Sequence, residues 1–134
     1  MTETAAMDAA VSVMSENWAW GDRDCATAAC AAFAELRGFD PMAPLRGQYS
    51  TALGCARIVR PHGSMTQCAI DVLGDQGFRI SERSEVGDLG LKYIRSGLFD
   101  AALVICVAPG IWAGKGYGGS MTFTKHCVGF KCPD

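Results

Sequence analysis

The sequence has neither an excess of basic residues nor a long apolar run. Twelve lysines and arginines stand against fourteen aspartates and glutamates among 134 residues, which gives a formal net charge of −2 at pH 7. A chain so close to neutral offers no basic surface that would neutralise phosphates, so we expect no nucleic-acid partner. The longest apolar run, residues 101–109, is about half as long as a membrane-spanning helix requires. We therefore expect no membrane span.

The amino terminus lacks the features of an export signal. Residues 1–17 contain acidic side chains near the start and have no basic region ahead of a compact apolar stretch. The seven cysteines are an odd number at irregular spacing, in a chain long enough to form its own core, which argues against a disulfide framework. We expect reduced and mostly buried thiols.

The chain does contain a helical first part followed by a β-rich second part. Apolar residues recur at helical spacing up to about residue 75, and from Gly77 short β-rich runs are separated by glycines. The pattern predicts helices over 4–17, 25–37, 48–59 and 64–73, and strands over 77–81, 89–94, 102–107, 111–113, 121–124 and 127–130. We expect one α+β domain over residues 1–134, in which helices from 1–76 pack on an antiparallel meander or small barrel from 77–134.

Cys25 is the strongest candidate for a chemical role. Asp24 is a typical N-cap and Gly38 a typical C-terminal stop, so Cys25 falls at the first position of a helix. A helix N-terminus can lower a thiol pKa from about 8.5 toward neutrality, whereas the carboxylates of Asp22 and Asp24 would repel a thiolate. Two interpretations stay open: a nucleophile, or a small residue that only packs.

Histidine is scarce, and this limits the catalytic hypotheses. A nucleophilic cysteine needs a base, and the sequence offers only His62, in the turn 60–63, and His126, on or near the last strand. His126 could face Cys25 across the fold. His126, Cys127 and Cys132 would converge on a metal only if the carboxyl-terminal segment curls, so a metal site is a weak alternative and no cofactor is expected.

Residues 114–119, Gly-Lys-Gly-Tyr-Gly-Gly, formally satisfy the pattern G-x-G-x-x-G. No helix is predicted after them, and they lie late among strands, so a dinucleotide site is not indicated. We interpret the segment as a flexible loop. With Trp112 and Tyr117 beside it, this loop is a candidate contact surface for a partner.

Several short motifs carry a family resemblance. Asp24-Cys25 opens a helix, and residues 87–91, Gly-Asp-Leu-Gly-Leu, open a strand much later. In this respect the chain resembles the NlpC-type papain-like cysteine peptidases, which cut bacterial peptidoglycan. Together with Trp20-Gly21, residues 38–41 (Gly-Phe-Asp-Pro) and residues 46–51 (Arg-Gly-Gln-Tyr-Ser-Thr), these motifs resemble a small NlpC-related group encoded among tail genes of long-tailed phages and gene transfer agents. The resemblance covers residues 18 to about 107.

The resemblance implies a catalytic arrangement that this chain does not complete. Cys25 would be the nucleophile, a histidine at the start of the strand after Gly87-Asp88 would be the base, and a polar residue on the next strand would orient that histidine. The base would fall near Asp100, Ala101 or Ala102, where the sequence has no histidine. A positioned base contributes about 10²- to 10⁴-fold, so the resemblance implies a degenerate peptidase fold.

Three functional hypotheses follow. The first is a structural component of a phage-like tail tip or baseplate, which docks to hub and other tail-tip proteins of the virion after assembly in the bacterial cytoplasm. The second is an active cysteine peptidase that cleaves peptidoglycan with Cys25 and His126. The third is a small metal-binding module with His126, Cys127 and Cys132. The position of the two histidines relative to Cys25 distinguishes the first hypothesis from the second.

Overall fold

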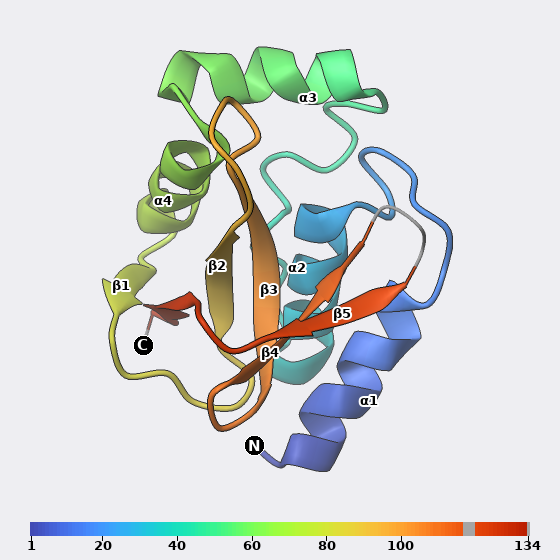
Figure 1. Ribbon diagram of the computed structural model, residues 1–134, viewed down its shortest axis with the longest axis vertical. Coiled ribbons are helices and arrows are strands. Elements are labelled where there is room, and N and C mark those ends of the chain that lie inside the picture. The colour runs from blue at the N-terminus through green and yellow to red at the C-terminus, as the bar shows by residue number, and fades with distance from the viewer. Residues whose placement is uncertain (117–119, 134) are drawn as a thin grey trace.

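The computed structural model describes residues 1–116 and 120–133, which form α-helices followed by an antiparallel sheet (Figure 1). The helices are α1 (Glu3–Met14), α2 (Cys25–Arg37), α3 (Ala52–Val59) and α4 (Met65–Asp75), with a short 3₁₀ helix, η1 (Arg60–His62), between the last two. The strands are β1 (Arg79–Ser81), β2 (Leu89–Tyr93), β3 (Ala101–Ala108), β4 (Ile111–Lys115), β5 (Met121–Thr124) and β6 (Val128–Lys131). The predicted α+β class, with helices before strands, is confirmed.

The sheet is antiparallel and open, so the predicted small barrel does not form, and the predicted meander is present in part. Strands β2 to β5 follow one another as a meander, but β6 returns to lie between β1 and β2, so the order is β1-β6-β2-β3-β4-β5. Trp112 on β4 reaches across β3 to glycines of β2 and β6: a Cβ atom at Gly90 would lie 2.6 Å from the Trp112 ring and one at Gly129 would lie 3.3 Å from it. Such long-range packing decides which strands pair, and strand patterns alone do not contain it.

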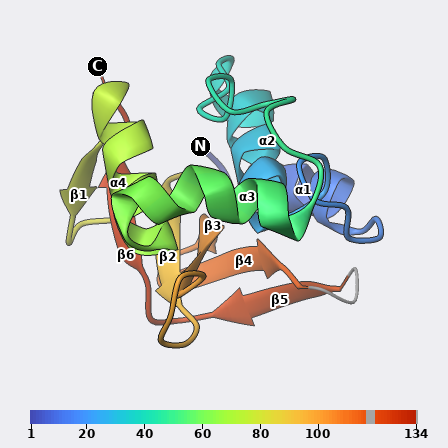
Figure 2. The same cartoon turned by 90° about the horizontal axis from the view of Figure 1, so that it is seen from above.

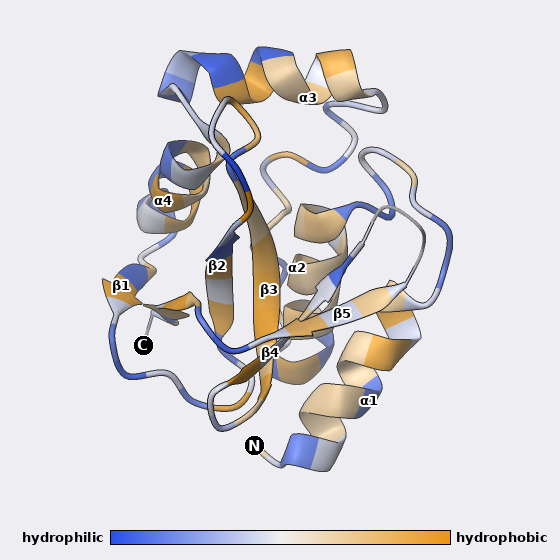
Figure 3. Cartoon of the chain, viewed as in Figure 1, coloured by the Kyte–Doolittle hydropathy of each residue, from blue (hydrophilic) through white to orange (hydrophobic). Residues whose placement is uncertain are grey.

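The helices cover one face of the sheet, as Figure 2 shows. Helices α1 and α2 pack against each other and against β3, and alanines make up most of their buried positions, which lets them approach closely. The central strand β3 is apolar along its length (Figure 3) and buried on both faces, because Val104 and Cys106 pack with Trp112 on the side away from the helices. No helix within the described ranges is long and apolar enough to span a membrane.

The helix boundaries follow local capping groups where these exist. Asp24 caps α2 and Gly38 ends it in the left-handed conformation, both as predicted. Helix α3 begins at Ala52, four residues later than predicted, because the Thr51 hydroxyl accepts the backbone N–H of Gly54. Helix α1 ends at Met14, before the predicted Asn17. At this end of the helix the ammonium group of Lys115, on β4, donates to the carbonyl oxygen of Met14.

The glycine-rich segment 114–119, interpreted from its sequence as a flexible loop, begins within a strand. Gly114 and Lys115 belong to β4, and Trp112 is 2% exposed, so this tryptophan is a core residue and not a contact surface. Strand β5, and no helix, follows the segment. Residues 117–119, which include Tyr117, lie outside the described residues.

Candidate functional site

Cys25 is the first residue of α2, and the side chain of Asp24 fixes its position. The Asp24 carboxylate accepts the backbone N–H of Thr27 at 2.8 Å, and the Thr27 hydroxyl accepts the backbone N–H of Asp24 at 2.9 Å. This reciprocal pair is a capping box. The same carboxylate also accepts the N–H of Gly21 at 2.8 Å and the hydroxyl of Tyr49 at 2.6 Å. Asp24 therefore links the turn, the helix start and a distant loop.

Gly21 makes this arrangement possible. Its φ of +81° lies in the left-handed region, and a Cβ atom at this position would lie 2.0 Å from the carbonyl oxygen of Tyr49. Only glycine combines that conformation with so close a backbone approach. The close packing of the turn against Tyr49 thus explains why glycine follows Trp20 in the Trp20-Gly21 motif.

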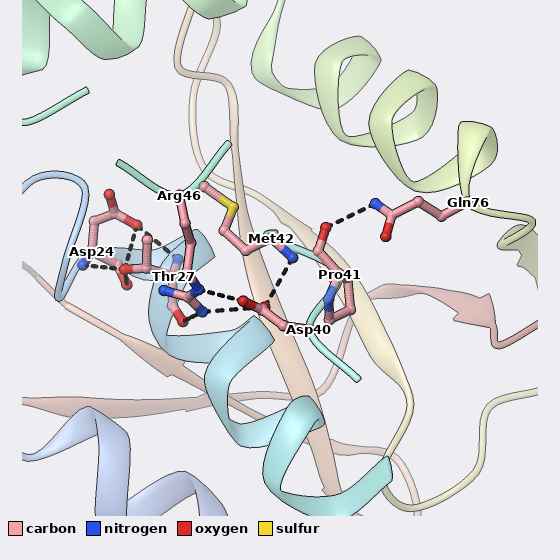
Figure 4. Close-up of polar contacts among 7 residues, drawn as sticks. All are labelled: Asp24, Thr27, Asp40, Pro41, Met42, Arg46 and Gln76. Carbon is pink, nitrogen blue, oxygen red and sulfur yellow. Dashed lines mark hydrogen bonds and ion pairs between the residues drawn. The ribbon is translucent and has the colours of Figure 1, made fainter. Parts of the chain in front are cut away.

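A second polar network holds the following loop against the same helix (Figure 4). Arg46 pairs with the carboxylate of Asp40, and its guanidinium also donates to the carbonyl oxygen of Thr27 at 3.3 Å. The side-chain amide of Gln76, just after α4, donates to the carbonyl oxygen of Pro41 at 2.8 Å. Residues from motifs 38–41 and 46–51 therefore support the first turn of α2 and tie it to α4.

A cavity of about 210 Å³ opens beside Cys25. Ala101 and Ala102, at the start of β3, lie on its wall together with the cysteine. Aromatic side chains of Trp18, Trp20 and Phe99 form another part of the wall. The helix start and the start of β3, which the resemblance places together, thus share one cavity.

The thiol of Cys25 is protonated at neutral pH. Burial raises its pKa from 9.0 to about 12, and repulsion from the Asp24 carboxylate adds to the rise. Contacts with the backbone amides of Leu103 and Ala26 oppose these effects without cancelling them. The helix N-terminus alone does not make this cysteine a thiolate.

We expect iodoacetamide to alkylate Cys25 slowly. Only the thiolate reacts, so at about pH 7.5 the rate should be about a hundredfold or more below that of free cysteine, and it should rise about tenfold per pH unit between about pH 7 and about pH 9. Mass spectrometry of the peptide that contains Cys25, set against glutathione in the same tube, measures this rate. A plateau near neutral pH would show an activated thiolate instead.

Neither histidine is among the residues that line the cavity. His62 lies in η1, where its Nδ1 is 2.7 Å from a carboxylate oxygen of Asp71 on α4, and this contact lowers the pKa of Asp71. His126 is exposed in the connection between β5 and β6. The sequence placed both residues as candidate bases, and the structure places both away from the cavity wall.

All seven cysteines are free thiols. Strand β6 separates Cys127 from Cys132, and His126 lies just before Cys127. Within residues 1–116 and 120–133, no group of three or more histidine, cysteine, aspartate or glutamate side chains is arranged to hold a metal ion.

Sequence reasoning missed Lys115, which also lines the cavity. It is 4% exposed on β4, and its ammonium group donates to the carbonyl oxygens of Met14, at 3.0 Å, and of Glu16. A cation at the carboxyl end of α1 complements the helix dipole, whereas burial lowers the pKa of Lys115. A lone lysine in the apolar strand Ile-Trp-Ala-Gly-Lys was the signal that could have identified it.

Replacing Lys115 by methionine is expected to lower the free energy of unfolding by about 1–3 kcal/mol. The substitution leaves two carbonyl groups without their buried donor, although it keeps most of the side-chain volume. Urea titration followed by circular dichroism measures the loss. Lys125→Met, at an exposed position, is the matched control and should leave the stability unchanged; equal stabilities of the two variants would contradict the capping role.

Comparison with known proteins identifies a family without an assigned activity. The family model described as "Domain of unknown function (DUF6950)" matches residues 2–129. No curated protein and no solved structure matches the chain. The matched range contains every residue of the cavity wall.

Proposed function

This chain belongs to the family described as "Domain of unknown function (DUF6950)", and we propose that it is a structural docking component of a phage-like tail tip or baseplate, with a degenerate NlpC-like peptidase fold. The motifs around Cys25 and Gly87-Asp88 support the NlpC-like ancestry. The proposed partners are the tail hub and other tail-tip proteins, and the proposed location is the virion tail after assembly in the bacterial cytoplasm.

The start of β3 supports the loss of catalysis. Ala101 and Ala102 share the cavity with Cys25, and neither side chain can accept a proton. Asp100, the remaining residue at the expected base position, uses its carboxylate to accept the backbone N–H of Thr66 at 2.9 Å and the Thr66 hydroxyl at 3.0 Å. A thiol whose pKa is about 12 therefore has no histidine at the position where the resemblance puts one, and the Asp100 carboxylate there bonds to Thr66 and is not among the residues that line the cavity.

An active peptidoglycan peptidase is the second candidate. A cysteine at a capped helix start beside a cavity favours it. His126 would then be the base, but it lies in the exposed connection between β5 and β6 and does not line the cavity.

Two experiments test the structural role. Purified wild-type protein, Cys25→Ala and His126→Ala are incubated with peptidoglycan sacculi, and released fragments are measured by liquid chromatography. We expect no release above the buffer control from any of the three, whereas release that both substitutions abolish would establish the peptidase instead. Mass spectrometry of tail particles purified from the strain that encodes the chain should detect it, and particles that lack it would overturn the docking role.

A further inference from the structure

The cavity beside Cys25 gathers positive charge in a protein whose net charge is negative. Lys92 on β2, Arg95 in the β2–β3 connection and Lys115 on β4 all line it. Asp24 is the only carboxylate among the described lining residues. The cavity wall therefore carries two more positive than negative charges, although the whole chain carries a formal charge of −2.

These charges are available to a ligand. Across residues 1–116 and 120–133, Lys92 and Arg95 form no ion pair. The Asp24 carboxylate, in contrast, already accepts hydrogen bonds from the N–H groups of Thr27 and Gly21 and from the Tyr49 hydroxyl. An ammonium group has three N–H donors, and Lys115 uses two of them on backbone carbonyl groups. An anion in this cavity would compensate cations that the fold leaves uncompensated.

The rest of the wall is mainly apolar, with Tyr49 and Thr122 as its other polar residues among those described. The rings of Trp18 and Trp20 meet edge to face with centroids 5.3 Å apart, and Trp20 lies 5.7 Å from the ring of Phe99. A volume of about 210 Å³ equals the space of about seven water molecules in the liquid, which suits one amino-acid-sized group. Aromatic walls contribute contact area with little loss of conformational entropy.

We propose that this cavity binds a carboxylate carried on a compact apolar body, about the size of one aromatic or branched aliphatic residue. Lys92 and Arg95 meet the carboxylate, and the tryptophans and Phe99 contact the apolar body. A dianionic phosphate suits the wall less well, because the Asp24 carboxylate lies in the same cavity and would repel a doubly charged group more strongly. The carboxylate comes from a free acid or from the last residue of a peptide chain. This binding goes beyond the docking role and does not depend on a tail partner.

The test compares N-acetyl-L-phenylalanine with its amide, which has the same size but no charge. Tryptophan fluorescence reports binding, because Trp18 and Trp20 line the cavity, and amide chemical shifts locate it. We expect the acid to bind at least about tenfold more tightly than the amide, and only the acid to weaken when the salt rises from about 50 mM to about 500 mM. Equal affinities, or no binding of either probe, would overturn the proposal.

Charge variants assign the binding to this cavity. The double variant Lys92→Met/Arg95→Gln should bind the acid about tenfold more weakly and the amide as before. Arg57→Gln/Arg79→Gln removes the same charge from two exposed positions outside the cavity wall and should bind both probes like the wild type. An unchanged affinity of the cavity double variant for the acid would also overturn the proposal, and thermal melting of each variant verifies folding.

A third pair of probes distinguishes the two sources of the carboxylate. A tripeptide that ends in phenylalanine is tested with a free and with an amidated carboxyl terminus. If the free-acid tripeptide binds more tightly than N-acetyl-L-phenylalanine, the carboxylate that the cavity recognises is the end of a peptide chain. If the two bind equally, it is the carboxylate of a single free residue. Either result retains the proposed carboxylate site. These binding measurements do not use peptidoglycan or tail particles. A negative result here would therefore overturn only the carboxylate site, and a negative result in the earlier experiments would overturn only the docking role.

Discussion

The free energy of unfolding is expected to fall by at least about 4 kcal/mol per pH unit as the pH rises above about 9. Burial raises the pKa of the Cys25 and Cys55 thiols from 9.0 to about 12 and that of the Cys127 thiol to about 11. It also raises the pKa of the Cys30, Cys68 and Cys106 thiols. Above pH 9 the unfolded chain loses its thiol protons, while the native chain still retains at least those of Cys25, Cys30 and Cys55. The unfolded state then binds fewer protons than the native state, so stability falls as the pH rises.

The size of this effect is large relative to the stability of a small domain. Each thiol contributes about 1.4 kcal/mol per pH unit, and typical domains are stable by about 5–15 kcal/mol. The hydroxyl of Tyr49, which donates to Asp24, also has a raised pKa and adds to the loss above its ordinary value of 10.0. The protein should therefore unfold within about one to four pH units above pH 9.

Urea titrations at a series of pH values, with a reductant present, measure this dependence. Cys30→Ala is the informative variant, because Cys30 is 1% exposed in an alanine-rich helix and the substitution removes one titrating group at a small change in volume. Above pH 9 its stability should decline by about 1.4 kcal/mol less per pH unit than that of the wild type, because one titrating thiol is gone. A wild-type stability that stays constant from about pH 8 to about pH 10.5 would contradict the expectation.

Local signals in the sequence predicted α2 well. The N-cap Asp24, the stop at Gly38 and the place of Cys25 all depend on hydrogen bonds between residues three to four positions apart, and such contacts leave a recognisable pattern. The sheet order involves contacts between residues far apart in the sequence, such as the packing of Trp112 over glycines on two other strands. No local pattern records that contact, so β6 was not expected between β1 and β2.

The candidate site was also predictable only in part, because contacts between residues far apart in the sequence leave no local pattern. The resemblance placed Cys25 near the start of β3, and Cys25, Ala101 and Ala102 do line one cavity. Lys115 was missed because its acceptor Met14 lies 101 residues away in the sequence. The charge balance of the cavity likewise combines residues from β2, β4, the β2–β3 connection and the N-cap of α2, and only the folded chain brings them together.

Asp24→Ala is expected to cost about 3–5 kcal/mol of stability. The Asp24 side chain is buried and accepts hydrogen bonds from the N–H groups of Thr27 and Gly21 and from the hydroxyl of Tyr49. Alanine leaves these donors without their acceptor, and each buried donor that loses its acceptor costs about 1–3 kcal/mol. Chemical denaturation of the variant at pH 7 measures the loss.

Two further variants divide this loss into its parts. Tyr49→Phe removes one of these donors without changing the helix cap and should cost about 1–2 kcal/mol. Once Asp24 is alanine, the same Tyr49→Phe change should cost little or should stabilise, because it then removes an unpaired buried hydroxyl. A cycle of the single and double variants therefore measures the coupling between Asp24 and Tyr49. If the two substitutions were additive, or if Asp24→Ala cost less than about 1 kcal/mol, Asp24 would not be the residue that holds the turn, the start of α2 and the Tyr49 loop together.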